Sequence, residues 1–213
     1  MKRWVPIAVV VVFVLAMLGW AASGYNALVR LDQGVRGAWG QVENVYQRRA
    51  DLVPNLVETV KGAAAFEKDT FTAVANARAQ VGQVSAAGVE KITSDPEAMA
   101  KFQQAQDGLS SALSRLLVVV ERYPDLKATA GFRDLQVQLE GTENRISVER
   151  GRFNETVQAY NTAIKRFPTV IFAGLFGHAA RPYFTATAGA DRPPEVEFDF
   201  NQKAAPAQPG AGG

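Results

Sequence analysis

The chain has 213 residues, a length that fits one domain plus a membrane anchor. Its 23 Lys and Arg residues against 21 Asp and Glu residues give a net charge of +2, which argues against nucleic-acid binding because that function normally needs a basic stripe or patch. It contains no cysteine, so disulfide bonds, thiolate nucleophiles and cysteine-based metal sites are excluded.

An uncharged apolar segment, residues 4–22, follows two basic residues at the N-terminus. A bilayer core of about 30 Å needs about 20 apolar residues in a helix, so we expect this segment to span a membrane. Trp4 and Trp20 stand near its two ends, where interfacial indoles are favoured. We therefore predict a transmembrane signal-anchor over residues 1–24.

A cleaved signal peptide is the competing interpretation of this segment, because the small residues 21–23 resemble a cleavage site. Signal peptides usually have a shorter apolar core of about 7–15 residues, which favours a retained anchor. Lys2 and Arg3 lie on one side of the span, and Arg30 and Arg36 lie on the other. The positive-inside rule then favours a cytoplasmic N-terminus and a domain on the extracytoplasmic side.

The next two predicted helices cover residues 25–49 and 51–81. Both carry apolar residues in steps of three and four, the spacing of one buried helix face. Asp51 is expected to cap the second helix, with Pro54 in its first turn where no backbone donor is missed. We therefore expect a break between Arg49 and Asp51.

A polar link over residues 82–94 leads to the third predicted helix. Asp95, Pro96 and Glu97 form a strong start signal: a capping side chain, a proline at the first position and an acid near the positive helix end. Tyr123 and Pro124 are expected to end this helix.

The fourth predicted helix has the clearest pattern in the chain, with an aromatic or aliphatic residue at every seventh position. These residues are Phe132, Leu139, Ile146, Phe153, Tyr160 and Phe167. An unbroken heptad repeat indicates helices that cross at shallow angles in a left-handed supercoil. We therefore predict an all-α fold: the transmembrane helix followed by an antiparallel four-helix, coiled-coil-like bundle over residues 25–168.

Two acids interrupt the apolar stripes and form a possible polar seam. Glu149 falls in the second stripe of the fourth helix, and Glu67 falls in the stripe of the second. Charged groups are rarely fully buried unless they are paired, which favours positions at the edge of the seam. The alternative is a polar layer that fixes helix register, or a groove that binds a partner between helices.

Three stretches of the chain closely resemble the bacterial LemA family. The matching motif residues are Arg48, Arg49, Asp51, Pro54, Asn55, Lys61, Tyr123, Pro124, Lys127, Thr142, Glu143, Asn144, Tyr160 and Asn161. Phe153 and Asn154, as well as Phe167 and Pro168, match the same pattern. The resemblance runs from about residue 25 to residue 184, in the family's order and spacing.

The resemblance implies an N-terminal membrane helix and an antiparallel bundle in a bacterial envelope protein, but it brings no defined biochemical activity. The chain departs from many relatives at Phe66, where they place a histidine beside the glutamate that is Glu67 here. Phe153 also replaces a common tyrosine. Any metal site built on that histidine is therefore missing from this chain.

A membrane-proximal segment, residues 169–184, follows the bundle, and its apolar stretch over residues 169–177 is too short to span a membrane. One interpretation is a segment that folds back over the open end of the bundle. The other is an interfacial element that dips into the lipid headgroups, carried by Ile171, Phe172, Leu175 and Phe176. Residues 185–213, rich in Pro, Gly and Ala, are predicted to be a disordered tail.

The predicted function is that of a scaffold or interaction protein in the cytoplasmic (inner) membrane of a bacterium, without catalytic activity. Expected partners are the lipid bilayer, further copies of the chain or other membrane proteins, and no cofactor is expected. An adaptor or regulator of a membrane protease or transporter is the alternative. A metal-dependent enzyme fits poorly, because His178 is the only histidine and is not part of a Glu-x-x-His pair. Trp39 and Phe71 are candidate contact residues, with core packing as the simpler interpretation.

Overall fold

The computed structural model describes residues 4–61 and 67–185, and all regular structure in this part of the chain is helical. The elements are α1 (Trp4–Lys61), α2 (Lys68–Ser85), α3 (Val89–Ser94), α4 (Pro96–Val120), α5 (Pro124–Lys127), α6 (Ala130–Lys165) and α7 (Thr169–Leu175). The predicted all-α class is confirmed. The tail predicted beyond residue 185 and the segment 62–66 lie outside the described residues.

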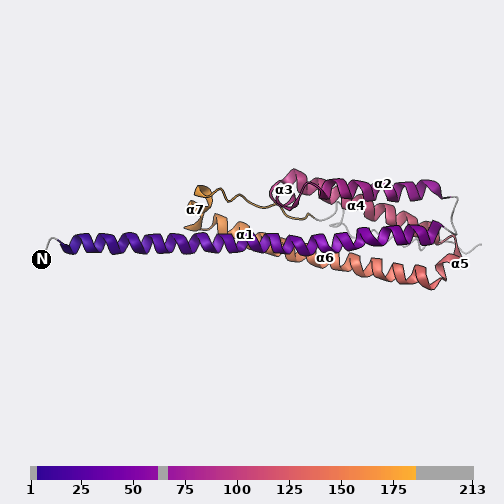
Figure 1. Ribbon diagram of the computed structural model, residues 1–213, viewed down its shortest axis with the longest axis horizontal. Helices are drawn as coiled ribbons and strands as arrows, with labels where there is room; N and C mark the ends of the chain where they lie inside the picture. Colours follow the sequence, from indigo (N-terminus) through magenta and orange to yellow (C-terminus); the bar gives the residue numbers. More distant parts are fainter. Residues whose placement is uncertain (1–3, 62–66, 186–213) are drawn as a thin grey trace, which may run out of the picture.

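One helix, α1, runs through the whole molecule for 58 residues (Figure 1). In its N-terminal third, the large apolar side chains from Ile7 to Leu18 are 47–66% exposed. From Leu28 onward, α1 buries one face against the bundle. Among the described helices, α1 alone has the length and composition to cross a membrane. This agrees with the predicted anchor.

The second part of α1 forms a four-helix bundle with α2, α4 and α6, and successive long helices run in opposite directions (Figure 1). The long helices associate as two neighbouring pairs, α1 with α6 and α2 with α4. The short helix α3 connects α2 to α4, and α5 makes the turn into α6. The predicted antiparallel bundle is therefore confirmed.

The predicted break between Arg49 and Asp51 is wrong, because α1 continues to Lys61 with Pro54 inside it. A proline within a helix has no N–H for the carbonyl four residues earlier, and here that carbonyl belongs to Ala50. The Arg78 side chain of α2 donates a hydrogen bond to the Ala50 oxygen over 3.1 Å. Tertiary contact thus satisfies the group that sequence reasoning expected to end the helix.

The predicted second helix is therefore divided between two elements. Its first apolar residues, such as Val53 and Leu56, are buried on α1, whereas Val74 and Val81 are buried on α2. Because α1 ends at Lys61 and α2 begins at Lys68, the boundary between the two helices falls about a dozen residues later than predicted. These residues of the apolar stripe are buried as predicted, but they belong to two helices instead of one.

The start of α4 follows the prediction closely. Asp95 accepts a hydrogen bond from the Glu97 amide at 2.9 Å, and Pro96 occupies the first position. The helix ends at Val120, earlier than predicted, and turn hydrogen bonds join Val119 to Arg122 and Val120 to Tyr123. The link before α4 contains α3, which the polar composition of the link concealed.

The heptad residues of α6 form its buried face, with one exception. Phe132, Leu139, Ile146, Phe153 and Tyr160 are all buried. The sixth, Phe167, is 76% exposed because α6 ends at Lys165 and the chain turns away. The repeat therefore continues in sequence beyond the helix that it defines.

The bundle core consists of two apolar clusters, one at each end. The distal cluster includes Val53, Leu109 and Phe132, and the membrane-proximal cluster includes Trp39, Phe102 and Phe153. Trp39, a candidate contact residue, is fully buried, and Phe71 packs against the distal cluster. Core packing therefore accounts for Trp39 in full and for Phe71 in part.

Replacing Pro54 by Ala should stabilise the protein if α1 is continuous. The new amide can donate to the Ala50 carbonyl and the ring clash disappears, a gain of about 1–3 kcal/mol after the lost rigidity of proline in the unfolded chain is subtracted. Arg78→Ala should cost about 0.5–1.5 kcal/mol in the parent chain and less beside Pro54→Ala. Urea unfolding of the four proteins measures both effects.

Arg115→Ala, which removes an exposed arginine from α4, is the matched control for that cycle. If Pro54 instead stood in the first turn of a separate helix, its replacement would leave stability unchanged or reduce it. Equal costs of Arg78→Ala in both backgrounds would separately contradict the role of its hydrogen bond to Ala50.

Candidate functional site

A buried polar layer separates the two apolar clusters of the bundle, and Arg49 of α1 lies at its centre. The Arg49 guanidinium donates to Ser110 Oγ at 2.7 Å and to Gln106 Oε1 at 2.6 Å, both on α4. It also donates to the Gln106 carbonyl at 3.2 Å and to Glu143 of α6 at 2.9 Å. One side chain thus fixes the register of three helices.

The two charged groups of this layer differ in their exposure to solvent. The Arg49 side chain is only 1% exposed, whereas that of Glu143 is 54% exposed. Arg49 also lies 5.2 Å from the centre of the Tyr46 ring, and burial raises the pKa of that tyrosine. If Glu143 were lost, water could take the place of its exposed carboxylate beside Arg49. If Arg49 were lost, its buried acceptors would be left without a donor.

The two acids predicted to form a polar seam lie elsewhere. Glu149 is half-buried on α6 and pairs with Arg152 three residues later at 2.8 Å. Glu67 precedes α2 and pairs with Arg122 at 2.9 Å. In the middle of α6, the buried polar residue is Thr142, whose hydroxyl donates to the Gln138 carbonyl at 2.7 Å.

After α7 the chain folds back along the bundle as an extended segment, residues 178–185, which we call the strap. Asn161 of α6 donates to the Arg181 carbonyl and accepts from the Arg181 amide, both at 2.8 Å. Asn154 contacts Phe184 in the same way, at 2.9 and 2.8 Å. Each asparagine therefore pairs with the strap as a neighbouring β-strand would.

The two asparagine contacts, which we call the strap clamps, have the same spacing along α6 as along the strap. Seven residues of α6 separate Asn154 from Asn161, a rise of about 10.5 Å. Three extended residues separate Arg181 from Phe184, which covers about 10 Å. The asparagines of two successive heptads therefore hold one continuous stretch of extended chain.

The side chain of Arg181 ties the strap to α1 and α3. Its guanidinium donates to Asp32 at 2.7 Å and to Glu90 at 3.1 Å, and Arg36 bridges the same two acids at 3.2 and 2.7 Å. Burial opposes ionisation of Asp32, but hydrogen bonds and charge from Arg181, and then from Arg36, outweigh it and lower the pKa of Asp32. The same acids raise the pKa of Arg181 against the effect of burial.

The aromatic side chain of Phe184 completes the membrane-proximal cluster. It stacks on Trp39 with ring centres 5.8 Å apart, and Phe153 meets it edge-on at 5.4 Å. Arg150 covers its outer face at 4.8 Å and donates to the Thr185 carbonyl at 2.9 Å. The strap is therefore part of the core of the bundle.

His178, at the start of the strap, packs against two aromatic side chains. Its Nδ1 lies 3.2 Å from the hydroxyl of Tyr160, and its ring is 6.4 Å from that of Tyr25. Burial and the nearby Asp32 charge raise the pKa of Tyr160. Within residues 4–61 and 67–185, no three His, Asp or Glu side chains gather as they would around a metal ion.

The remaining motif residues are mostly exposed. Gln47 donates to Asp51 at 2.8 Å, Thr59 donates to the Asn55 carbonyl, and Tyr123 packs beside the distal cluster. Pro54, Lys61, Pro124 and Lys127 lie on the surface, the last paired with Glu121. These residues belong to the distal half of the bundle and are not gathered into one cavity.

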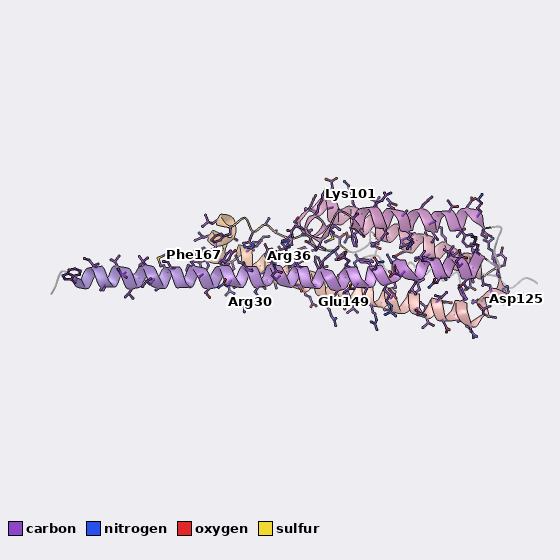
Figure 2. The ribbon with its side chains drawn as sticks, in the orientation of Figure 1. Arg30, Arg36, Lys101, Asp125, Glu149 and Phe167 are labelled. Atoms are coloured by element: carbon purple, nitrogen blue, oxygen red, sulfur yellow. The ribbon has the colours of Figure 1, made fainter. Side chains whose placement is uncertain are left out.

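An open groove of about 560 Å³ lies between α1 and α6. Two of the exposed motif residues, Arg48 and Asn144, line it together with Arg145, Val148 and Arg152. Figure 2 shows Glu149, which also lines this groove, on the α1–α6 side of the molecule and Lys101 on the opposite side. The groove carries three arginines against one glutamate and so presents a basic surface.

The four residues predicted to be interfacial lie on or directly after α7. Phe172 is half-buried and meets Trp20 edge-on at 5.4 Å, and Phe176 packs on Tyr25 at 4.8 Å. Ile171 and Leu175 point away from the bundle and are exposed. Both earlier interpretations thus have a structural counterpart: the strap folds back over the bundle, and α7 leaves apolar side chains uncovered.

Sequence reasoning missed Gln106, Asp32 and Arg181, whose polar side chains reach partners more than fifty positions away. One signal was available, because Asn154 and Asn161 recur at heptad spacing beside buried aromatic residues. Polar residues repeated at that spacing indicate a line of contacts along one side of a helix.

Replacing Arg49 by Lys should destabilise the bundle by about 3–5 kcal/mol, because an ammonium group cannot reach acceptors on both α4 and α6. Glu143→Gln should cost much less, since that side chain is half open to water. Arg48→Lys on the neighbouring exposed position is the control and should stay within about 0.5 kcal/mol. Urea unfolding measures all three, and equal losses for Arg49 and Arg48 would contradict the layer.

Replacing Asp32 by Asn should loosen the strap and cost about 1–3 kcal/mol at neutral pH. A carboxyl whose pKa is lowered by folding contributes stability above its unfolded pKa of about 3.9, and that stability is lost as pH falls through the folded value. The difference in the free energy of unfolding between the parent and the variant, measured by urea unfolding, should therefore narrow below about pH 4. Asp125→Asn, at the distal end of the bundle (Figure 2), is the control. A gap that stays constant down to pH 2 would contradict this ion pair.

The chain resembles several known proteins in sequence. The chain is 27% identical over 201 residues to magnetosome protein MamQ of Magnetospirillum gryphiswaldense, covering 88% of this chain and 74% of the relative. It is 26% identical over 203 residues to magnetosome protein MamQ 2 of Paramagnetospirillum magneticum, covering 87% and 75%. Residues 38–198 match the LemA family, from the bundle through the strap. The chain belongs to the LemA family.

Proposed function

We propose that the protein is a membrane-anchored helical scaffold or interaction protein without catalytic activity. The observation that carries this proposal is the unbroken α1, which joins the apolar N-terminal segment to the distal end of the bundle. A hinge between anchor and domain would let the domain turn freely. A continuous helix instead presents the bundle at a fixed height above the membrane.

The groove between α1 and α6 is the surface that best suits a partner. It contains exposed motif residues that stabilise no buried contact, which sets it apart from the Arg49 layer and the strap clamps. Val148 supplies an exposed apolar side chain among Arg48, Arg145 and Arg152. Such a surface fits a partner that carries acidic groups around a small apolar contact.

The names of the relatives also fit an interaction role, since they assign those proteins to the magnetosome and name no reaction. We place the bundle on the extracytoplasmic side of the cytoplasmic membrane of a bacterium, on the charges that flank the anchor. An adaptor or regulator of a membrane protease or transporter is the second candidate. It differs from a self-associating scaffold only in the identity of the partner.

A photo-crosslinking residue at Val148, in membranes of cells that express the full chain, tests this proposal. Val118 of α4 is the matched control, because both valines are exposed (52% and 67%) on different helix pairs. We expect a discrete crosslinked product from position 148 that is absent from position 118. A second, differently tagged copy shows whether the partner is the chain itself.

A product that contains both tags favours a homo-oligomeric scaffold, and a stoichiometric product with another protein favours the adaptor. The same weak pattern from both positions would contradict the groove as an interface. Turnover of a substrate that depends on residues of the groove would contradict the absence of catalysis.

A further inference from the structure

The exposed apolar side chains outside the N-terminal part of α1 are concentrated around α7. Phe167, Val170, Ile171, Leu175 and Phe176 are all exposed there, whereas the exposed valines of α4 and α6 stand singly. A cluster of this kind on a soluble surface usually marks an interaction site. The inner side of α7 is already occupied, because Ala173 is buried against the bundle.

The position of α7 along α1 identifies what covers this cluster. Phe172 contacts Trp20, and a Cβ atom on Gly24 would lie 3.7 Å from the Phe172 ring, so α7 lies beside residues 20–25. Figure 1 shows it at the end of the bundle that faces the free part of α1. The twenty helical steps from Trp4 to Gly24 rise about 30 Å, the thickness of a bilayer core. A span that begins at Trp4 therefore ends level with α7.

The charges around α7 agree with this depth. The segment from Thr169 to Gly177 contains no ionisable residue. Lys165 and Arg166 precede it at the end of α6, and Arg30 follows on α1, all three exposed. Figure 2 shows Phe167 and Arg30 near the same end of the bundle. Apolar side chains at the depth of the lipid boundary, flanked by cations at headgroup level, are typical of interfacial elements.

We propose that α7 inserts into the same leaflet from which α1 emerges, with Ile171, Leu175 and Phe176 among the acyl chains. This inference rests on the proposed membrane span of α1. A single spanning helix leaves the bundle free to rotate about its axis, but a second contact beside it fixes that rotation. The strap follows α7 directly, so this contact also ties the Arg181 and Phe184 contacts to the membrane surface.

Depth-dependent fluorescence quenching tests the proposal in the full chain, which has no native cysteine. Bimane is attached to Leu175→Cys, Val10→Cys or Val118→Cys after reconstitution into vesicles of phosphatidylcholine and phosphatidylglycerol. Nitroxide lipids at shallow or deep acyl positions are the quenchers. We expect shallow nitroxides to quench Leu175 several-fold more than Val118, and deep nitroxides to quench Val10.

Charge variants add a second criterion. Ile171→Asp should reduce the quenching at Leu175 toward the value for Val118, because a carboxylate opposes insertion. Val137→Asp, on an exposed position of α6, should leave it unchanged.

The outcomes separate this proposal from the anchor. If Val10 is not quenched, the membrane span itself is wrong and the proposal falls with it. If Val10 is quenched but Leu175 behaves like Val118, the anchor stands and insertion of α7 is overturned. Blue-shifted bimane at Leu175 without lipid quenching would show that protein covers α7, which also overturns the proposal.

Discussion

The continuity of α1 through Pro54 is the constraint on which the rest of the structure depends. A proline inside a helix leaves the carbonyl of Ala50 without its backbone donor, and Arg78 of α2 provides the replacement. This contact also holds α2 beside the distal half of α1. Because the helix does not break before Lys61, one element connects the membrane-competent segment to the far end of the bundle.

Two polar systems then fix the other helices against α1. The Arg49 layer joins α1, α4 and α6 at mid-height, where a slip of one helix would leave buried hydrogen-bonding groups unpaired. The strap joins α1, α3 and α6 at the membrane-proximal end through Arg181 and two asparagines. Several family motif residues thus explain stability and register, whereas Arg48 and Asn144 line the outer groove that we propose as a partner surface.

The periodic features of the sequence predicted the fold well. The heptad residues of α6 and the cap at Asp95 are local patterns, and both appear in the structure almost as expected. The helix break at Asp51 was mispredicted because the side chain that satisfies Ala50 comes from Arg78, 28 positions away. Burial of Arg49 was also beyond local reasoning, since its acceptors lie 57–94 positions away. The site residues that were missed, above all Arg181, have partners that only the tertiary fold identifies.

A distance between two spin labels on α1 tests its continuity most directly. Gln33→Cys and Glu58→Cys place the labels at exposed positions on either side of Pro54, in a chain without other cysteines. Pulsed electron paramagnetic resonance on the reconstituted protein should give a narrow distribution near 37 Å, the length of 25 helical residues. A fold-back at Arg49–Asp51 would bring the two backbones to about 17 Å, and a distance in that range would contradict the continuous helix.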